Sequence, residues 1–201
     1  MIQAGAPRLV LASQSVAQAA VLRAAGLVFE TRPAAIDEAA IKASMIQDGE
    51  DAASCALTLA DLKAARPRDR EVLVIGADQL LVCEGEWFDK PPDLAAARAQ
   101  LERLRGREHT LVTAIVVQRG GEAIWHHVAT PRLVMRRFSD AFLDAYLAAE
   151  GEAVLASVGA YRLEGLGIHL FERIEGEHFA IMGLPLLALL GFFRQHGVLT
   201  G

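Results

Sequence analysis

The feature that most constrains this chain is a long apolar run, residues 72–82, which is interrupted once. Val, Ile and Leu dominate the run, and a continuous stretch of this kind predicts a strand that is buried on both faces. The interruption is Gly76-Ala77-Asp78-Gln79. Its small residues allow the backbone to turn or to lie very close to a neighbouring segment. We therefore expect this strand to lie at the centre of the fold.

Asp78 is the one charged residue in this run. A carboxylate does not stay charged in an apolar core without a partner. In one interpretation, a nearby Lys or a cap satisfies Asp78. In the other, the buried strand opens at Asp78, and the carboxylate faces a cleft and holds a cation, at the kind of place where α/β proteins carry out their chemistry. The residues alone leave both interpretations open.

The composition limits the class of protein. The 201 residues suit one domain, or two small lobes that share a core. With 53% hydrophobic and 22% charged residues, global disorder is not expected. A net charge of -5 argues against a general nucleic-acid-binding surface. The sequence also has no stretch that approaches the roughly 18 uncharged apolar residues of a membrane span, so neither nucleic acid nor membrane is expected as a partner.

We expect a cytoplasmic protein with reduced cysteines. Residues 1–7 lack the charged region and long apolar segment of a secretory signal. Cys55 and Cys83 have no metal-site spacing and form no evident disulfide framework. Buried, reduced thiols are therefore predicted at both positions.

The chain begins with a strand, a turn and a helix. Residues 8–12 predict a short strand, and residues 16–25 predict a helix that Gly26 ends. Ser13 or Ser15 is suited to cap this helix. A plain capped helix is one interpretation of the two serines. The other is a phosphate site, because a helix N-terminus offers free N–H groups next to these hydroxyls.

The later elements show no internal repeat. Glu84-Gly85 between apolar flanks predicts a hairpin turn, and the glycines of residues 159–167 predict a chain that turns repeatedly. The further predicted strands are residues 27–32, 110–118, 123–136 and 168–172, the predicted helices are residues 51–65, 93–104 and 139–149, and two more helices open near residues 36–38 and 183–185.

Two carboxylates, two lysines and a hydroxyl-bearing helix start form a set that suits phosphate chemistry. Glu38 and Asp78 could hold Mg²⁺, which takes one or two carboxylates together with phosphate oxygens and water. Lys63 and Lys90 would neutralise the charge of a polyphosphate, and one carboxylate would orient or deprotonate a water molecule. Ordinary alternatives remain, since Glu38 also suits a helix dipole and a lysine such as Lys63 usually lies on a solvated surface.

These residues stand in segments that occur in a particular order along the chain. The segments include Leu-Val-Leu-Ala-Ser13-Gln-Ser15, Ile-Asp-Glu38, Leu-Ala-Asp-Leu-Lys63-Ala, Ile-Gly-Ala-Asp78, Lys90-Pro91, and Gly-Ala-Tyr161 through Glu164-Gly-Leu-Gly. In this order they resemble the Maf family of nucleoside triphosphate pyrophosphatases. The resemblance extends from Leu9 to about Leu199, and it is closest to the branch that acts on 7-methyl-GTP.

The resemblance implies an α/β fold with a central mixed twisted sheet, flanking helices and two lobes around a deep cleft. It implies one domain over residues 1–201, whose two lobes share one core. The implied reaction is hydrolysis of a nucleoside triphosphate between the α and β phosphates, which gives a nucleoside monophosphate and pyrophosphate. A divalent cation, Mg²⁺ or Mn²⁺, is implied as the cofactor, and a homodimer is compatible with the family.

The resemblance also implies roles for individual residues. Asp78 matches the proton acceptor of the family, and Glu38 and Asp78 together match the metal-binding carboxylates. The positions that match the family's phosphate- and metal-handling residues are Ser13, Ser15, Glu38, Lys63 and Lys90, of which Glu38, Lys63 and Lys90 join Asp78 as the expected catalytic residues.

One departure from the family concerns the first motif. It usually reads Ser-x-Ser-Pro-Arg-Arg, whereas here Ser15 is followed by Val16, Ala17 and Gln18. A guanidinium grips phosphate more strongly than a neutral amide does. The change predicts a weaker enzyme with Gln18 as a substrate-binding residue, or a phosphate contact from Arg8 or Arg23. It also leaves open a catalytically weak, nucleotide-binding regulator of septum formation.

Two further positions, Gln79 and Glu164, match residues that tune the nucleotide in the family. Members that act on dTTP and UTP resemble Asp-Thr and Gln-Gly there, whereas the 7-methyl-GTP branch resembles Asp-Gln and Glu-Gly, as this chain does. A carboxylate at Glu164 can accept hydrogen bonds from N1–H and the exocyclic amine of guanine, whereas uracil and thymine offer one donor. The positive charge of 7-methylguanine also favours a carboxylate. The sequence thus predicts 7-methyl-GTP as the substrate, with dTTP or UTP as the alternative.

Overall fold

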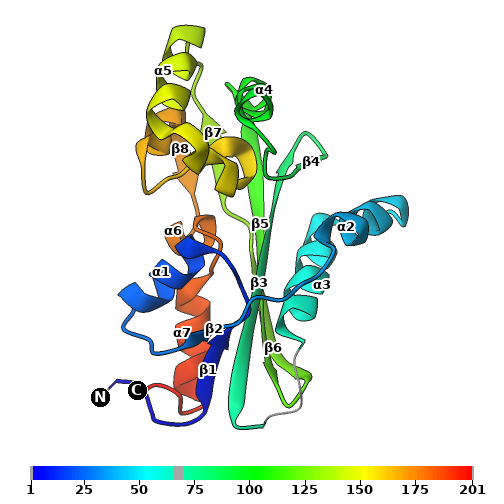
Figure 1. Cartoon of the computed structure of the whole chain (residues 1–201), viewed down its shortest axis with the longest axis vertical. Coiled ribbons are helices and arrows are strands. Elements are labelled where there is room, and N and C mark those ends of the chain that lie inside the picture. Colours follow the sequence, from blue (N-terminus) through cyan, green and yellow to red (C-terminus); the bar gives the residue numbers. More distant parts are fainter. Residues whose placement is uncertain (1, 66–69, 201) are drawn as a thin grey trace. The chain divides into compact units, whose positions relative to one another are not determined.

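The computed structural model describes residues 2–65 and 70–200 (Figure 1). The chain divides into two compact units. The first comprises the described residues of 1–78, 113–129 and 177–201, and the second comprises residues 79–112 and 130–176. Two long strands contribute residues to both units, because each unit boundary at residues 78–79 and 112–113 falls within a strand.

The described residues form a mixed sheet of eight strands, which confirms the predicted α/β class. Neighbouring strands are hydrogen-bonded in the order β2-β1-β3-β5-β7-β8, while β4 pairs with β3 and β6 pairs with β5. The strands are β1 (Arg8–Leu11), β2 (Glu30–Thr31), β3 (Val72–Cys83), β4 (Glu86–Phe88), β5 (Glu108–Arg119), β6 (Glu122–Ala129), β7 (Arg132–Met135) and β8 (Phe171–Glu175).

In the first unit, β1 pairs in parallel with both β2 and β3, so that Leu11 lies opposite Ile75. The helices of this unit are α1 (Val16–Ala24), α2 (Glu38–Gln47), α3 (Ala52–Ala64), α6 (His178–Ile181) and α7 (Leu186–Gln195). Side-chain oxygens of Ser15, Asp37 and Asp51 accept hydrogen bonds from the first turns of α1, α2 and α3. These three helices therefore begin next to the polar residues from which their starts were predicted.

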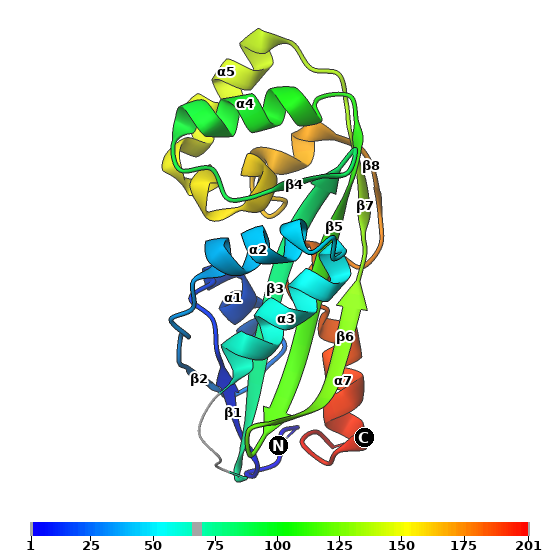
Figure 2. The ribbon, with the colours of Figure 1, turned by 90° about the vertical axis from the view of Figure 1, so that its right-hand side faces the viewer.

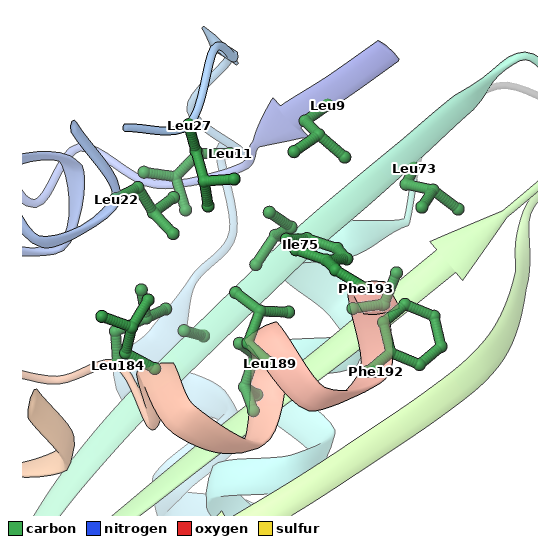
Figure 3. Close-up of a cluster of buried hydrophobic side chains, with 14 of the residues drawn as sticks. Leu9, Leu11, Leu22, Leu27, Leu73, Ile75, Leu184, Leu189, Phe192 and Phe193 are labelled. Atoms are coloured by element: carbon green, nitrogen blue, oxygen red, sulfur yellow. The ribbon is translucent and has the colours of Figure 1, made fainter. Parts of the chain in front are cut away.

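Side chains alternate across the strands of the first unit, and each face packs against different helices. Leu73 and Ile75 of β3 gather on one face with Leu189, Phe192 and Phe193 of α7, in a cluster that also includes α1 (Figure 3). On the other face, the alternate residues of β1 and β3 pack with the end of α3. This alternation is why the apolar run of residues 72–82 needs cover on both sides. Figures 1 and 2 show α1 and α7 on one side of these strands and α3 on the other.

β3 passes through Gly76 without a turn. A Cβ atom added at Gly76 would lie 2.0 Å from the carbonyl oxygen of Ala60 and 2.8 Å from the backbone nitrogen of Ala64. The backbone of α3 therefore crosses β3 directly over this glycine. The prediction of a close approach at Gly76 is confirmed, whereas the prediction that the buried strand opens at Asp78 is wrong. β3 continues to Cys83 because residues beyond Asp78 are also buried and pair with β4.

The second unit contains two longer helices and a series of short ones. α4 (Leu94–Leu104) is capped by Asp93 and α5 (Asp140–Glu150) is capped by Ser139, as predicted. The turn between β3 and β4 has positive φ at Glu84 and Gly85, which confirms the hairpin. The glycine-rich stretch and the residues on either side of it form three 3-10 helices, which are η1 (Gly151–Ala156), η2 (Val158–Ala160) and η3 (Leu166–Leu170).

Three predicted strands have different bounds in the structure. The strand predicted over residues 123–136 is two strands, β6 and β7, because Pro131 lacks an N–H donor and interrupts the ladder. The strand predicted over residues 168–172 begins only at Phe171, since η3 precedes it. The strand predicted over residues 27–32 is reduced to β2, where Glu30 and Thr31 pair with β1.

Within the described residues, no helix combines the length and apolar character that crossing a membrane requires. Cys55 and Cys83 are both buried and unbonded to each other, as predicted for free thiols.

His109 of β5 is a buried polar residue in the second unit. Its side chain is almost inaccessible to solvent, and Nε2 lies 2.9 Å from the hydroxyl oxygen of Tyr161. The ring also packs against Phe171. Burial lowers the pKa of His109 from 6.5 to about 4, so the folded protein keeps this imidazole neutral.

We predict that His109 makes the protein acid-sensitive. Between pH 6.5 and 4 the unfolded chain binds a proton at this ring and the folded protein does not, so stability falls as the pH falls through that window. The loss attributable to His109 should be about 2 kcal/mol between pH 7 and pH 5. Urea unfolding at both pH values should show this loss in the wild type. In His109→Gln, the free energy of unfolding should change less between the two pH values. The exposed control His126→Gln should keep the wild-type dependence, and an equal slope in all three proteins would contradict the prediction.

Candidate functional site

Lys63 lies between two carboxylates in the first unit. Its Nζ atom is 2.5 Å from Oδ1 of Asp78 and 2.8 Å from Oε1 of Glu38. The side chain of Asp78 is 5% exposed and that of Lys63 is 14% exposed, whereas that of Glu38 is 44% exposed. The interpretation of Lys63 as a solvated surface lysine is therefore wrong. Asp78 does have a lysine partner, as one of its two interpretations required.

The packing of α3 on β3 explains this arrangement. Gly76 and Asp78 are two residues apart in a strand, so they face the same side of the sheet. The last turn of α3 presses against Gly76, and Lys63 belongs to that turn. Glu38 reaches the same lysine from the first residue of α2. Three elements thus converge because one glycine allows two backbones to touch.

The charges of these groups are coupled. Burial raises the pKa of Asp78 above its ordinary value, and the Lys63 ammonium opposes this rise without cancelling it. Burial alone would lower the pKa of Lys63, but the charges and hydrogen bonds of Asp78 and Glu38 outweigh it, so the pKa of this lysine is raised. Lys63 therefore remains an ammonium group, positioned where it can meet negative charge on a ligand.

Asp78 has one oxygen that is not used by Lys63. Its Oδ2 atom is buried and has no hydrogen-bond partner among the described residues. Residues 2–65 and 70–200 contain no group of three or more His, Cys, Asp or Glu that could hold a metal. Mg²⁺ does not require such a group, because it binds through one or two carboxylates and completes its shell with water and phosphate oxygens. The pair Glu38 and Asp78, with a free buried oxygen, fits such a cation.

The serines at the start of α1 act as caps. Oγ of Ser15 accepts a hydrogen bond from the backbone N–H of Gln18 at 3.3 Å, and Oγ of Ser13 accepts one from the N–H of Ser15 at 3.0 Å. The capped-helix interpretation is therefore confirmed. It does not exclude a ligand, since each hydroxyl still has a proton to donate.

Gln18 is buried below this helix start. Its Nε2 donates to the carbonyl oxygen of Gly183 at 2.9 Å, and its Oε1 has no partner among the described residues. Arg8 and Arg23 do not replace the missing arginines of the motif. Arg8 begins β1 and pairs with Glu30, and Arg23 lies in the last turn of α1 over the ring of Phe29. Each lies at the end of its element that is remote from the serines.

Three expected site residues belong to the second unit. Gln79 is a half-buried residue of β3, and Lys90 is exposed in the extended segment after β4. Glu164 is part of the turn between η2 and η3, where its Oε1 lies 3.3 Å from Nε of Arg162. The structure thus brings Glu38, Lys63 and Asp78 together in the first unit. Gln79, Lys90 and Glu164 belong to the second unit.

Sequence reasoning missed the partners of Glu164. Arg162 also pairs with Glu150, whose side chain is only 6% exposed at the last residue of α5. An acidic residue at a helix C-terminus is unfavourable to the helix dipole. This misplaced charge was the one signal in the sequence that could have indicated a specific partner for Glu150.

Fold and site together define an α/β protein in which a part-buried lysine lies between two carboxylates, in the same unit as a strand–turn–helix start that bears hydroxyls. The comparisons identify the family. The chain belongs to the Maf family, because the sequence model of the family described as "Maf-like protein" matches residues 8–196.

Several relatives are similar over nearly their whole length. A "Nucleoside triphosphate pyrophosphatase" of Granulibacter bethesdensis is 58% identical over 195 residues, which cover 96% of this chain and 99% of the relative. A protein of the same name from Paramagnetospirillum magneticum is 52% identical and covers 94% of this chain and 99% of its own length. A "7-methyl-GTP pyrophosphatase" of Rhizobium meliloti is 46% identical, with coverage of 96% and 98%.

We predict that Asp78 depends on Lys63 for stability, whereas Lys63 keeps Glu38 as a partner when Asp78 is neutral. Lys63→Met leaves a buried carboxylate without its partner and should cost about 3 kcal/mol in the free energy of unfolding. The double variant Lys63→Met/Asp78→Asn should recover most of this loss, because a buried amide carries no charge. Denaturant unfolding of the two single variants and the double variant measures the coupling. Lys90→Met is the control at an exposed lysine. If the loss in the double variant equalled the sum of the losses in the two single variants, the prediction would be contradicted.

Proposed function

We propose that this chain is a nucleoside triphosphate pyrophosphatase, a hydrolase that cleaves a nucleoside triphosphate to a nucleoside monophosphate and pyrophosphate. The observation that carries the proposal is the buried Asp78 carboxylate, with Lys63 at 2.5 Å and a second oxygen left free. Such a pair provides a base and a cation at one place, which water attack on a phosphate requires. Membership of the Maf family and the names of the relatives support the same reaction.

In the proposed reaction, Oδ2 of Asp78 takes a proton from a water molecule. The water oxygen forms a bond to one of the phosphorus atoms that share the α–β bridge, in line with the bridging bond that breaks. The leaving group keeps the electron pair of that bond. It is pyrophosphate when the water attacks the α phosphorus and the nucleoside monophosphate when the water attacks the β phosphorus, so both routes give the same two products. The ammonium of Lys63 stabilises the negative charge that develops on the phosphoryl oxygens, and the family resemblance assigns phosphate charge to Lys90 as well.

We propose that Glu38 and Asp78 hold the divalent cation, Mg²⁺ or Mn²⁺. Glu38 is half-exposed and can turn toward a ligand, whereas Asp78 is fixed by the strand. When bound, such a cation neutralises triphosphate charge and helps to orient the phosphates. The fit of these two residues rests on their oxygen chemistry, and the two carboxylates already hold one cation, the ammonium of Lys63, between them.

The phosphates need a further grip, which we assign to the start of α1. Ser13 and Ser15 can each donate a hydroxyl proton to a phosphate oxygen next to the free N–H groups of the helix. Gln18 supplies an amide in the motif where arginines are usual, and its Nε2 is already bonded to Gly183. The grip is therefore weaker than one with a guanidinium. This weakness favours a second candidate, a nucleotide-binding regulator of septum formation with little turnover.

We propose 7-methyl-GTP as the substrate, with dTTP or UTP as the alternative. Glu164 is partly exposed and can accept two hydrogen bonds from the Watson–Crick edge of a guanine, and its charge suits the cationic methylated base. Gln79 completes the pair of positions that resembles the 7-methyl-GTP branch. The Rhizobium meliloti relative that bears this substrate in its name is 46% identical, which supports the assignment.

The proposal also covers the setting of the reaction. Nucleoside triphosphates are cytoplasmic metabolites, and two buried free thiols are in keeping with a reducing compartment. We therefore keep a cytoplasmic location, a homodimer and the lack of a nucleic-acid or membrane partner as predictions.

We predict a defined substrate order and defined products. With Mg²⁺ or Mn²⁺, the protein should convert 7-methyl-GTP to 7-methyl-GMP and pyrophosphate in equal amounts, faster than GTP, CTP, dTTP or UTP. ³¹P NMR of the product mixture identifies both products. Addition of EDTA should stop the reaction. Release of inorganic phosphate with a nucleoside diphosphate would contradict the proposed reaction, and binding of 7-methyl-GTP without turnover would favour the regulator.

The same panel tests the assignment of the base. Glu164→Gln should lower kcat/KM for 7-methyl-GTP by about tenfold, because it removes one charge-assisted hydrogen bond, and should narrow the preference over dTTP and UTP. Glu172→Gln, an exposed control of the same chemistry, should change neither value. An unchanged preference in Glu164→Gln would refute the assignment of base recognition to this carboxylate.

A further inference from the structure

The segment that carries Glu164 is a tight turn within the second unit. The N–H of Gly165 donates to the carbonyl oxygen of Arg162 at 3.1 Å, so the chain closes on itself around Glu164. A Cβ atom at Gly167 would lie 2.4 Å from the same carbonyl oxygen, which leaves no room for any other residue there. This packing gives the backbone of Glu164 one defined conformation.

Glu150 anchors this turn from the end of α5. Its Oε1 accepts a hydrogen bond from the N–H of Leu166 at 2.7 Å, and its Oε2 lies 3.1 Å from Nη1 of Arg162. Gly165 packs against the same carboxylate, since a Cβ atom there would lie 2.6 Å from Oε1. One buried carboxylate therefore contacts the turn on both sides of Glu164.

Arg162 connects the buried carboxylate to the exposed one. Its Nη1 pairs with Glu150, and its Nε donates to Oε1 of Glu164 at 3.3 Å. The side chain of Glu150 is 6% exposed, whereas those of Arg162 and Glu164 are both 36% exposed. The contact with Glu150 is thus the protected one. Arg162 contacts Oε1 of Glu164, which leaves Oε2 and the second lone pair of Oε1 to accept hydrogen bonds from a ligand.

The other end of the turn is fixed as well. The hydroxyl group of Tyr161 lies 2.9 Å from Nε2 of His109, and the hydroxyl of Tyr146 donates to the carbonyl oxygen of Ala160 at 3.2 Å. Both contacts are buried. Glu164 therefore lies between two hydrogen-bonded anchors, which is the arrangement expected of a group that must be held ready for a ligand.

We propose that Glu150 is a positioning residue for nucleotide base recognition, which acts through Arg162 to orient the carboxylate of Glu164. The proposal rests on the proposed function, because it assigns Glu164 to the base. A buried acid at a helix C-terminus is electrostatically unfavourable by itself. Its two contacts with the turn explain why a carboxylate, with two acceptor oxygens, is required at this position.

The test compares a base-bearing ligand with a base-free one. Glu150→Gln keeps the shape of the side chain and an oxygen for Leu166, but it weakens the contact with Arg162. Calorimetry in EDTA, which stops turnover, should show about tenfold weaker binding of 7-methyl-GTP and unchanged binding of ribose 5′-triphosphate, which lacks the base. The matched control Glu152→Gln, at an exposed residue two positions later, should change neither affinity.

A second variant separates positioning from folding. In a Glu164→Gln background, Glu150→Gln should cause no further loss of affinity for 7-methyl-GTP, because the residue through which it acts is already altered. Equal losses for both ligands, or the same loss in both backgrounds, would overturn the proposal. Because binding is measured without turnover, a wild-type protein that binds 7-methyl-GTP without cleaving it would refute the proposed function while these comparisons still decide the role of Glu150.

Discussion

The passage of α3 over Gly76 is the contact on which the candidate site depends. A side chain at this position would displace the helix, because a Cβ atom would meet the carbonyl oxygen of Ala60 at 2.0 Å. The close approach brings Lys63 to Asp78 and buries both. A buried ion pair contributes little stability compared with apolar residues of the same size. Its presence in the middle of the most apolar strand is better explained by chemistry than by folding.

Much of the fold could be predicted from local signals. Caps at Ser15, Asp93 and Ser139, and the hairpin at Glu84-Gly85, act over a few residues, so their consequences are visible in the sequence. The strand bounds were harder to predict. The alternation of residues 123–136 predicts one continuous strand, although a proline within such a run is itself a signal for a break in the ladder, and β6 ends before Pro131.

The candidate site could be predicted in its residues more than in its geometry. Family resemblance pointed to Glu38, Lys63 and Asp78. The pattern of apolar and polar residues along the chain does not indicate that the Lys63 ammonium lies between two carboxylates. That arrangement depends on the contact at Gly76, which joins residues far apart in the chain. Glu150 was missed for the same reason, since its contacts with Arg162 and Leu166 arise only when the turn folds back onto α5.

The most direct test of the central claim is the turnover of Asp78→Asn with 7-methyl-GTP and Mg²⁺. Pyrophosphate release should fall by at least about 100-fold, because the base is lost, while the midpoint of thermal unfolding changes little because Lys63 keeps Glu38 as a partner. Asp51→Asn, which replaces the capping carboxylate of α3 with an equally good cap, should keep wild-type turnover. Retention of most activity in Asp78→Asn would contradict the account.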